Sequence, residues 1–276
     1  MHGVEPWRLP VPLTLTLIGA LLLQARGFVR LRRAGEAPPP AWQLATFATG
    51  LLALWIALGS PLATLDHRLL TAHMVQHLVV MTLAAPLLLA SSPVRTLIAG
   101  LPQRLVRTVL RPLLASAPAR ALGRFLSHPV VCWLAGTGVV MVWHVPALFA
   151  AMLRAPGWHT VQQLSFLAAG LLFWWPVVLP WPAVARWPRW SMPLYLFFAT
   201  LPCDALSAFL AFSGRVVYPH YLSAHLTFEA TPLGDQVAAG ALMWLVVTVA
   251  YLLPAVAITL RLLSPARTEV RAAQPS

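Results

Sequence analysis

The sequence predicts an all-α, polytopic membrane protein with seven transmembrane helices. Of its 276 residues, 59% are hydrophobic and only 9% are charged, whereas a soluble domain carries about 25% charged residues. The mean hydropathy of +0.75 reflects more apolar surface than one water-soluble core absorbs. Apolar stretches of about 20 residues, the length at which a helix spans a bilayer, recur along the whole chain.

Seven stretches reach spanning length at a helical rise of about 1.5 Å per residue. They cover residues 10–29, 41–60, 69–89, 130–150, 160–180, 192–212 and 233–253. The first is expected to be a retained helix, because only Arg8 precedes it and no clear small-x-small cleavage site is present. We expect residues 1–264 to form a single transmembrane domain and residues 265–276 to form a mobile cytoplasmic tail.

Arginine placement predicts the orientation, because short loops rich in arginine stay in the cytoplasm. One alternating set of segments holds fifteen arginines and the other holds four. The larger set is Arg26, Arg30, Arg32, Arg33, Arg95, Arg104, Arg107, Arg111, Arg120, Arg124, Arg186, Arg189, Arg261, Arg267 and Arg271; the smaller is Arg8, Arg68, Arg154 and Arg215. The N-terminus is therefore expected outside and the C-terminus in the cytoplasm. This topological role explains the net charge of +12, so nucleic acid is not an expected partner.

The longest cytoplasmic loop, residues 91–127, has an amphipathic pattern. Three arginines share one helical face against three apolar residues; these are Arg104, Arg107 and Arg111 against Leu105, Val109 and Leu113. The pattern is typical of an interfacial helix bound to anionic lipid headgroups. A docking surface for a partner protein is the alternative.

The histidines gather on the outer side of the predicted topology. Only His128 falls at the cytoplasmic face; the others are His2, His67, His73, His77, His144, His159, His220 and His225. In the third stretch, His73 and His77 are four residues apart and project from one helix face, a spacing that suits two imidazole ligands on one metal. Met81 continues this stripe with a soft thioether. Interhelical hydrogen bonding or headgroup contact is the alternative role.

Other stretches bring polar side chains to a similar depth. His144 lies near the outer end of the fourth stretch, where Pro146 can redirect the helix, and His159 opens the fifth. Asp235 opens the seventh stretch together with Gln236, and Met243 lies two turns deeper. We therefore expect a metal site built from His73, His77 and His144, with His159, Met243 or Asp235 adjacent. An interfacial aromatic belt with the neighbouring tryptophans is the alternative for His144 and His159.

The sixth stretch carries a carboxylate near mid-bilayer. Cys203 and Asp204 follow Pro202, and a charged Asp at this depth costs about 3 kcal/mol. Asp204 is thus expected to be protonated, paired or next to a hydrated cavity. It serves either as a metal or proton group or as a neutral hydrogen-bonding residue between helices.

Several motifs occur in a characteristic order between residues 58 and 251. They are H-M-V-Q-H with A-A-P-L-L, H-P-V-V with W-H-V-P, H-T-V-Q-Q-L-S-F-L with G-L-L-F-W-W-P, V-Y-P-H-Y, and D-Q with G-A-L-M-W. In this combination the chain resembles the CtaG-type cytochrome c oxidase assembly family of bacterial inner membranes. The positions that match the family pattern are His73, Met74, Gln76, His77, Trp143, His144, His159, Asp235, Gln236, Met243 and Trp244. The chain departs from the pattern at Gln163, where a second histidine is expected.

The resemblance implies a seven-helix, non-enzymatic assembly factor that works on haem-copper oxidase subunits in the bacterial inner membrane. Its expected role is to accept copper, as Cu(I), on the periplasmic side and deliver it to the apo-oxidase. Two other classes remain open: a haem-binding or electron-transfer protein with histidine axial ligands, and a proton-coupled transporter that uses Asp204 and Asp235.

Overall fold

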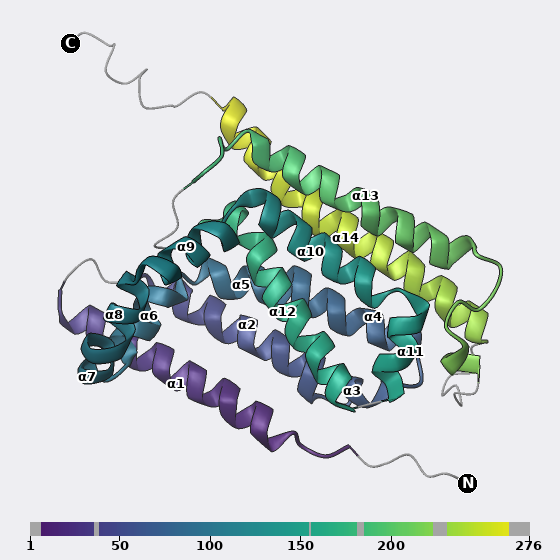
Figure 1. Cartoon of the computed structure of the whole chain (residues 1–276), viewed down its shortest axis with the longest axis horizontal. Coiled ribbons are helices and arrows are strands. Elements are labelled where there is room, and N and C mark those ends of the chain that lie inside the picture. Colours follow the sequence, from purple (N-terminus) through teal and green to yellow (C-terminus); the bar gives the residue numbers. More distant parts are fainter. Residues whose placement is uncertain (1–6, 36–38, 155, 181–184, 223–230, 265–276) are drawn as a thin grey trace.

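The computed structural model describes residues 7–35, 39–154, 156–180, 185–222 and 231–264, and every regular element in them is a helix (Figure 1). Six helices are long and apolar enough to cross a membrane, and a bent pair brings the number to seven if it forms one span. The chain is therefore a multi-pass membrane protein, and the predicted all-α class is confirmed. The expected tail at 265–276 lies outside the described residues.

The elements follow one another as short and long helices. They are α1 Val11–Arg33, α2 Ala41–Gly59, α3 Leu62–Leu65, α4 Leu70–Leu78, η1 Val79–Ala84, α5 Ala85–Ala90, α6 Pro93–Gly100, α7 Gln103–Leu105, η2 Val106–Leu110, α8 Arg111–Ala115, α9 Ala117–Leu126, α10 Pro129–Trp143, α11 Pro146–Arg154, α12 Pro156–Val178, α13 Ser191–Phe212, η3 Pro219–Leu222 and α14 Pro232–Leu263. The third span is continuous from α4 through η1 to α5.

The π-helical turn η1 interrupts the third span just before Pro86. There the N–H of Ala85 donates to the carbonyl of Val80, five residues earlier. The next carbonyl, that of Met81, would need an N–H from Pro86, which has none. The indole Nε1 of Trp174 on α12 supplies the missing donor at 2.8 Å. This bond ties α12 to the third span at the depth of Met81.

The fourth predicted span, residues 130–150, is wrong in its outer part. Helix α10 ends at Trp143, and α11 is a separate helix that starts at Pro146. Proline disfavours helical geometry in the residue before it and cannot donate a backbone hydrogen bond. The 15 residues of α10 extend about 22 Å, which is short of a hydrocarbon core of about 30 Å. Helices α9 and α10 are long and apolar enough to cross a membrane only when they are taken together, and the chain bends by 65° between them.

The two ends of the bundle differ in composition. The arginine end carries the last turn of α1, with Arg30, Arg32 and Arg33, and the segment from α6 to α9. The histidine end carries α3, α11 and η3. Helix α1 begins at the histidine end, and α14 finishes at the arginine end (Figure 1).

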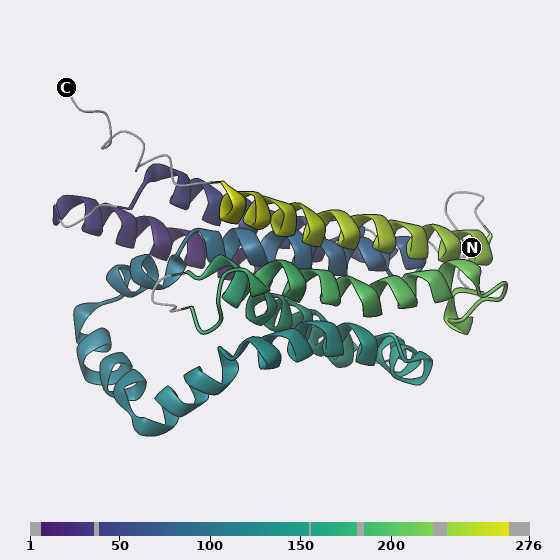
Figure 2. The same cartoon turned by 90° about the horizontal axis from the view of Figure 1, so that it is seen from above.

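The segment from α7 to α9 extends away from the bundle at the arginine end (Figure 2), whereas α6 packs against α1. Instead of one regular amphipathic helix, the extended segment contains a π-helical turn, η2, before Pro112, and a break at Ser116. Its apolar side chains are exposed, with Leu113 at 59% and Phe125 at 60%. The membrane-surface role expected for this segment stays a prediction.

Candidate metal centre

Helix α4 directs His73 and His77 toward the interior of the bundle. Both are buried, and their ring centroids lie 4.1 Å apart with nearly perpendicular planes. Among the described residues, no hydrogen bond reaches any of the four ring nitrogens. Since buried polar groups nearly always have a partner, this pair has the features of a site that receives an ion or ordered water.

A cavity of about 30 Å³ lies beside His77, and we refer to it as the chamber. A water molecule needs about 10 to 15 Å³ on this scale, so the chamber has room for one ion or a water molecule. Its walls are Met74, His77, Leu78, Met81, Thr82, Val140, His144, Phe166, Cys203, Met243, Val247 and Tyr251. Three of the predicted site residues, His77, His144 and Met243, therefore meet at one cavity.

His144 presents an available nitrogen toward the chamber. Its Nδ1 lies 2.7 Å from the carbonyl oxygen of Val140, and only a protonated Nδ1 can donate there. In the neutral ring Nε2 is then the unprotonated nitrogen, and it lies 3.5 Å from the sulfur of Met74. The His144 ring centroid is 6.3 Å from that of His77. The hydroxyl of Tyr218 also donates to the His144 carbonyl at 3.0 Å, which fixes the end of α10.

Four sulfur-containing side chains line the chamber: Met74, Met81, Cys203 and Met243. Met74 and Met81 flank His77 at helical spacings of three and four residues, which gives them one face of the third span. Met74 lies three residues before His77, so the sequence alone already indicates that the two share a helix face. Cys203, a free thiol, joins them only through packing of α13. Thioether and thiol donors together with imidazole suit Cu(I) better than hard cations.

Close packing of α13 and α14 brings Cys203 and Met243 to the same cavity. A Cβ atom on Gly240 of α14 would lie 2.8 Å from the carbonyl oxygen of Ser207 on α13. Such contacts are closer than side chains allow, so glycine is required for this approach. A larger residue would separate the two helices just where they contribute to the chamber.

Asp235 and Gln236 are occupied by backbone groups. The carboxylate of Asp235 accepts hydrogen bonds from the N–H groups of Leu70, at 2.6 Å, and Thr71, at 3.2 Å. It thus caps the start of α4, where the helix dipole favours a negative charge. The side chain of Gln236 donates to the carbonyls of Leu210 and Arg215 and accepts from the N–H of Val217. The pair anchors α4 and the connection after α13.

A second group of possible ligands, Asp66, His67 and His159, lies at the histidine end; we call it the mouth cluster. Its ligand atoms all lie within 4.8 Å of one another. Nε2 of His159 is 3.0 Å from one Asp66 carboxylate oxygen, and Nε2 of His67 is 3.6 Å from the other. The Asp66 side chain is 1% exposed and that of His67 is 50% exposed. The cluster therefore connects a buried carboxylate to the surface.

The backbone around Asp66 is held by η3. The hydroxyl of Tyr221 donates to the Asp66 carbonyl at 2.8 Å. Burial, and then the nearby negative charge of Asp66, raises the pKa of Tyr221 well above its ordinary value, so this hydroxyl keeps its proton. Asp66 was not among the site residues predicted from the sequence, because its partner His159 is distant in the chain and no short motif joins them.

Two glutamines connect the mouth cluster to α4. The amide nitrogen of Gln163 lies 3.1 Å from Oε1 of Gln76 and 3.1 Å from Nε2 of His159. Gln163, which replaces the histidine expected from the family pattern, thus links α12 to α4. His159 and His73 face each other across this link with ring centroids 6.3 Å apart. The predicted His159 therefore belongs to the mouth cluster and lies next to the His73–His77 pair.

Unpaired polar atoms concentrate in this region. Within the described ranges, thirteen buried side-chain nitrogen and oxygen atoms lack a hydrogen-bond partner, and ten belong to six residues of the third span, its approach and α12. These are Asp66, His73, Gln76, His77, Gln162 and Gln163. Because each unpaired buried group costs free energy, their concentration marks this region as the candidate functional centre.

The remaining candidates lie elsewhere. Asp204 is absent from the chamber walls, unlike its neighbour Cys203. His128 accepts a hydrogen bond from the N–H of Val130 as the cap of α10. His220 lies at η3, 3.1 Å from the carbonyl of His67. His2 and His225 lie outside the described residues.

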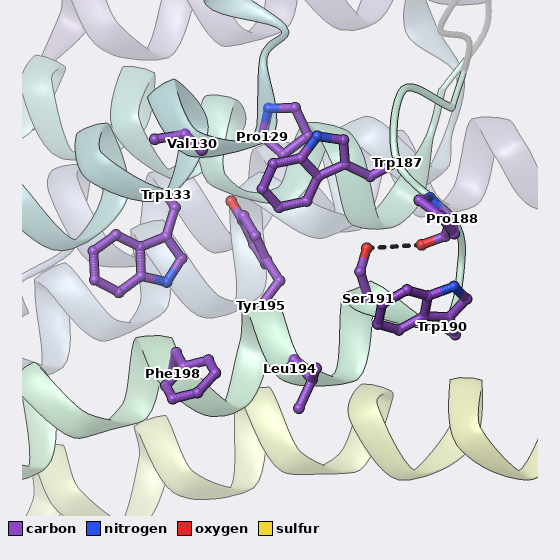
Figure 3. A pocket seen from close by; sticks show the side chains of 10 residues that line it. All are labelled: Pro129, Val130, Trp133, Trp187, Pro188, Trp190, Ser191, Leu194, Tyr195 and Phe198. Atoms are coloured by element: carbon purple, nitrogen blue, oxygen red, sulfur yellow. Dashed lines mark hydrogen bonds between the residues drawn. The ribbon is translucent and has the colours of Figure 1, made fainter.

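A larger groove of about 560 Å³ lies between α10 and the start of α13 (Figure 3). Three tryptophans, Trp133, Trp187 and Trp190, contribute to its walls. The hydroxyl of Ser191 donates to the carbonyl of Pro188, and that of Tyr195 donates to the carbonyl of Phe173. It contains no histidine, cysteine, methionine or carboxylate. This groove therefore offers no metal ligand of those types.

Comparison with known proteins places most of the chain in one family. Residues 22–264 match the family model described as cytochrome c oxidase caa3 assembly factor. Uncharacterized proteins of Mycobacterium leprae and Mycobacterium bovis are each 26% identical, over 86% and 80% of this chain and over 36% and 34% of their own lengths. The chain thus spans about a third of the length of these curated relatives. No solved structure matches it.

Proposed function

Because the chain belongs to the cytochrome c oxidase caa3 assembly factor family, we propose that it receives Cu(I) in the chamber and delivers it to an apo-oxidase subunit. The observation that carries this proposal is the meeting of His77 and His144 with four sulfur-containing side chains around one ion-sized cavity. In this role the chain is a non-enzymatic metal carrier. Copper is its cargo and the oxidase subunit is its partner.

The donor set supports copper in its reduced state. Thioether sulfur and neutral imidazole are soft or borderline ligands, and they favour Cu(I) over Mg²⁺, Ca²⁺ or Mn²⁺. Nε2 of His144 and the sulfur of Met74 are 3.5 Å apart. Bonds of about 2.0 Å to nitrogen and 2.3 Å to sulfur at a tetrahedral angle give about this separation. We therefore assign His77, His144, Met74 and Met243 as ligands, with His73 and Cys203 next to them.

Asp235 is not among the ligands that we propose. Both of its carboxylate oxygens accept backbone hydrogen bonds at the start of α4, and Asp235 is not one of the residues that line the chamber. His159 acts at the mouth cluster instead of in the chamber. Of the six residues predicted from the sequence, the proposed centre thus keeps His77, His144 and Met243 as ligands and His73 beside them, and it gives His159 and Asp235 separate roles.

We propose that the histidine end faces the periplasm of a bacterial inner membrane. Fifteen of the nineteen arginines belong to segments assigned to the opposite side, and arginine-rich segments stay in the cytoplasm. The segment from α7 to α9 would then lie at the cytoplasmic surface, where its arginines contact anionic headgroups and its exposed leucines enter the bilayer. Copper would arrive from the periplasmic side.

The two other functional classes have less support. A chamber of about 30 Å³ is far below the several hundred cubic ångströms that sites for larger ligands occupy, so it does not accommodate a haem. A proton-coupled transporter needs carboxylates on a path through the bundle. Here Asp235 is engaged by backbone groups, and Asp204 is not part of the chamber wall.

Copper analysis of the purified full chain tests the proposal. We expect about one Cu(I) per chain for the wild type in detergent, loaded under reducing conditions and desalted, and almost none for the His73→Ala/His77→Ala variant. Met243→Leu conserves volume and should weaken Cu(I) binding at least tenfold without altering helix content. His128→Asn, which changes a histidine at the other end, is the matched control. Full copper occupancy in the double variant would refute the assignment.

A deletion strain tests the cellular role. Loss of the protein should lower the activity and the copper content of a haem-copper oxidase, while respiration through copper-free quinol oxidases continues. Millimolar external copper should restore part of the activity. Lost activity with unchanged oxidase copper would contradict a delivery role.

A further inference from the structure

We propose that the mouth cluster of Asp66, His67 and His159 is a capture site, which takes Cu(I) from the aqueous side and passes it to His73 and His77 by ligand exchange. The inference rests on the proposed function, since it assumes that the chamber is the destination of the metal. It assigns a role to one carboxylate and two histidines that do not line the chamber.

The geometry of the mouth cluster fits metal capture. The two imidazole nitrogens and the carboxylate oxygens lie within 4.8 Å of one another, and bonds of about 2 Å to a shared ion place ligand atoms about 3 to 4 Å apart. Half of the His67 side chain is exposed, whereas His159 is 22% exposed and Asp66 is 1% exposed. An ion would meet His67 first and then the buried pair.

The charges in the cluster favour a cation. The buried carboxylate of Asp66 faces ring nitrogens of His159, at 3.0 Å, and of His67, at 3.6 Å, and a buried carboxylate is strongly unfavourable unless a positive charge compensates it. Nε2 of His159 lies 3.0 Å from an Asp66 oxygen and 3.1 Å from the amide nitrogen of Gln163. With the imidazole in its neutral form and Nε2 unprotonated, this nitrogen and the carboxylate oxygen are two adjacent acceptors. A cation bound between them would be attracted to both.

A line of imidazoles leads from the mouth cluster to the chamber. Successive ring centroids are separated by 5.5 Å from His67 to His159, 6.3 Å from His159 to His73 and 4.1 Å from His73 to His77. Two imidazoles that share an ion at about 2 Å each have centroids up to about 6 Å apart, so each step is close to the reach of one ligand exchange. A nitrogen of His73 binds as one from the mouth cluster leaves, and copper stays Cu(I) throughout.

The ligand types give this path a direction. The mouth cluster offers one carboxylate and two imidazoles, whereas the chamber offers imidazoles and thioethers. A soft ion such as Cu(I) binds more tightly to the second set. The carboxylate supplies charge that attracts the ion but bonds it weakly, as a transient site requires. Capture at the mouth cluster should therefore control the rate of loading, and the chamber should control the final occupancy.

The test measures both quantities on the full chain in detergent. Cu(I) is supplied from a coloured Cu(I) chelator, and the loss of chelator absorbance is followed in time and at equilibrium. His67→Ala and Asp66→Asn should load about tenfold more slowly than the wild type and reach the same final occupancy. His128→Asn should load at the wild-type rate. His67 is half exposed, so its substitution carries little risk to the fold even if Asp66→Asn misfolds.

The outcomes separate this inference from the proposed function. Wild-type loading rates in both mouth variants, with full occupancy, would overturn the capture site and leave the chamber intact. No binding by the wild type would refute the proposed function itself. Slow loading together with loss of final occupancy in His67→Ala would place a ligand of the stable site at the mouth and would also overturn the division of roles.

Discussion

Replacing His77 with leucine should stabilise the metal-free protein while abolishing its response to copper. Both ring nitrogens of His77 are buried without a partner in the described structure, and an unpaired buried polar group costs about 1 to 3 kcal/mol. Leucine has a similar volume, and such a replacement costs less than about 1.5 kcal/mol in repacking. The metal-free His77→Leu variant should therefore gain about 1 kcal/mol in free energy of unfolding.

Cu(I) should reverse the order of stability of the wild type and the His77→Leu variant. At a free Cu(I) concentration one hundred times its Kd, a ligand that binds only the folded state adds about 2.7 kcal/mol. The wild type should show this gain, and the His77→Leu variant should show almost none. Unfolding in mixed detergent micelles, followed by circular dichroism with and without Cu(I), measures both effects.

His144→Leu provides the matched control, because this histidine does have a hydrogen bond. Its Nδ1 lies 2.7 Å from the Val140 carbonyl, and loss of that bond should lower the metal-free stability by about 1 kcal/mol. A metal-free His77→Leu chain that is less stable than the wild type by 1 kcal/mol or more would contradict the role assigned to His77. His77 would then be a residue that stabilises the fold instead of a metal ligand.

Three further predictions concern the residues that position the site and the orientation of the chain in the membrane. Asp235→Asn removes the charge that caps α4 and should lower the free energy of unfolding by about 1 to 2 kcal/mol, while the copper bound per chain at saturation stays near the wild-type value; a loss of copper in a folded variant would return Asp235 to the ligand set. Trp174→Phe leaves the Met81 carbonyl beside Pro86 without its donor and should cost about 1 to 3 kcal/mol, measured by the same unfolding titration; an unchanged midpoint would show that water replaces the indole. Reporter fusions at Gln103 and Ser276 should both report cytoplasm, and an external signal at either position would reverse the orientation of the histidine end.

The residues that could be placed from the sequence are those whose neighbours are local in the chain. Apolar stretches predicted the position of six spans, as in the agreement of residues 192–212 with α13 Ser191–Phe212. The last of them, predicted for residues 233–253, continues in the structure to Leu263. The spacing of four between His73 and His77 predicted one shared face, because helical periodicity alone fixes that relation. The fourth span was wrong because Pro146 ends the helix early, although the proline itself was recognised as a place where the chain can turn.

Tertiary structure decided which side chains meet. Asp66 directly follows α3, whereas His159 lies on α12. No helical periodicity relates two residues so far apart in the chain, yet their side chains meet at 3.0 Å. Cys203 reaches the chamber because Gly240 lets α13 and α14 approach closely. Asp235, a ligand candidate by residue type, is held by the first N–H groups of α4. The helical membrane spans and the residue types of the candidate site thus follow from the sequence alone. Contacts between helices determined which of these side chains share a cavity, because such contacts depend on packing between segments far apart in the chain.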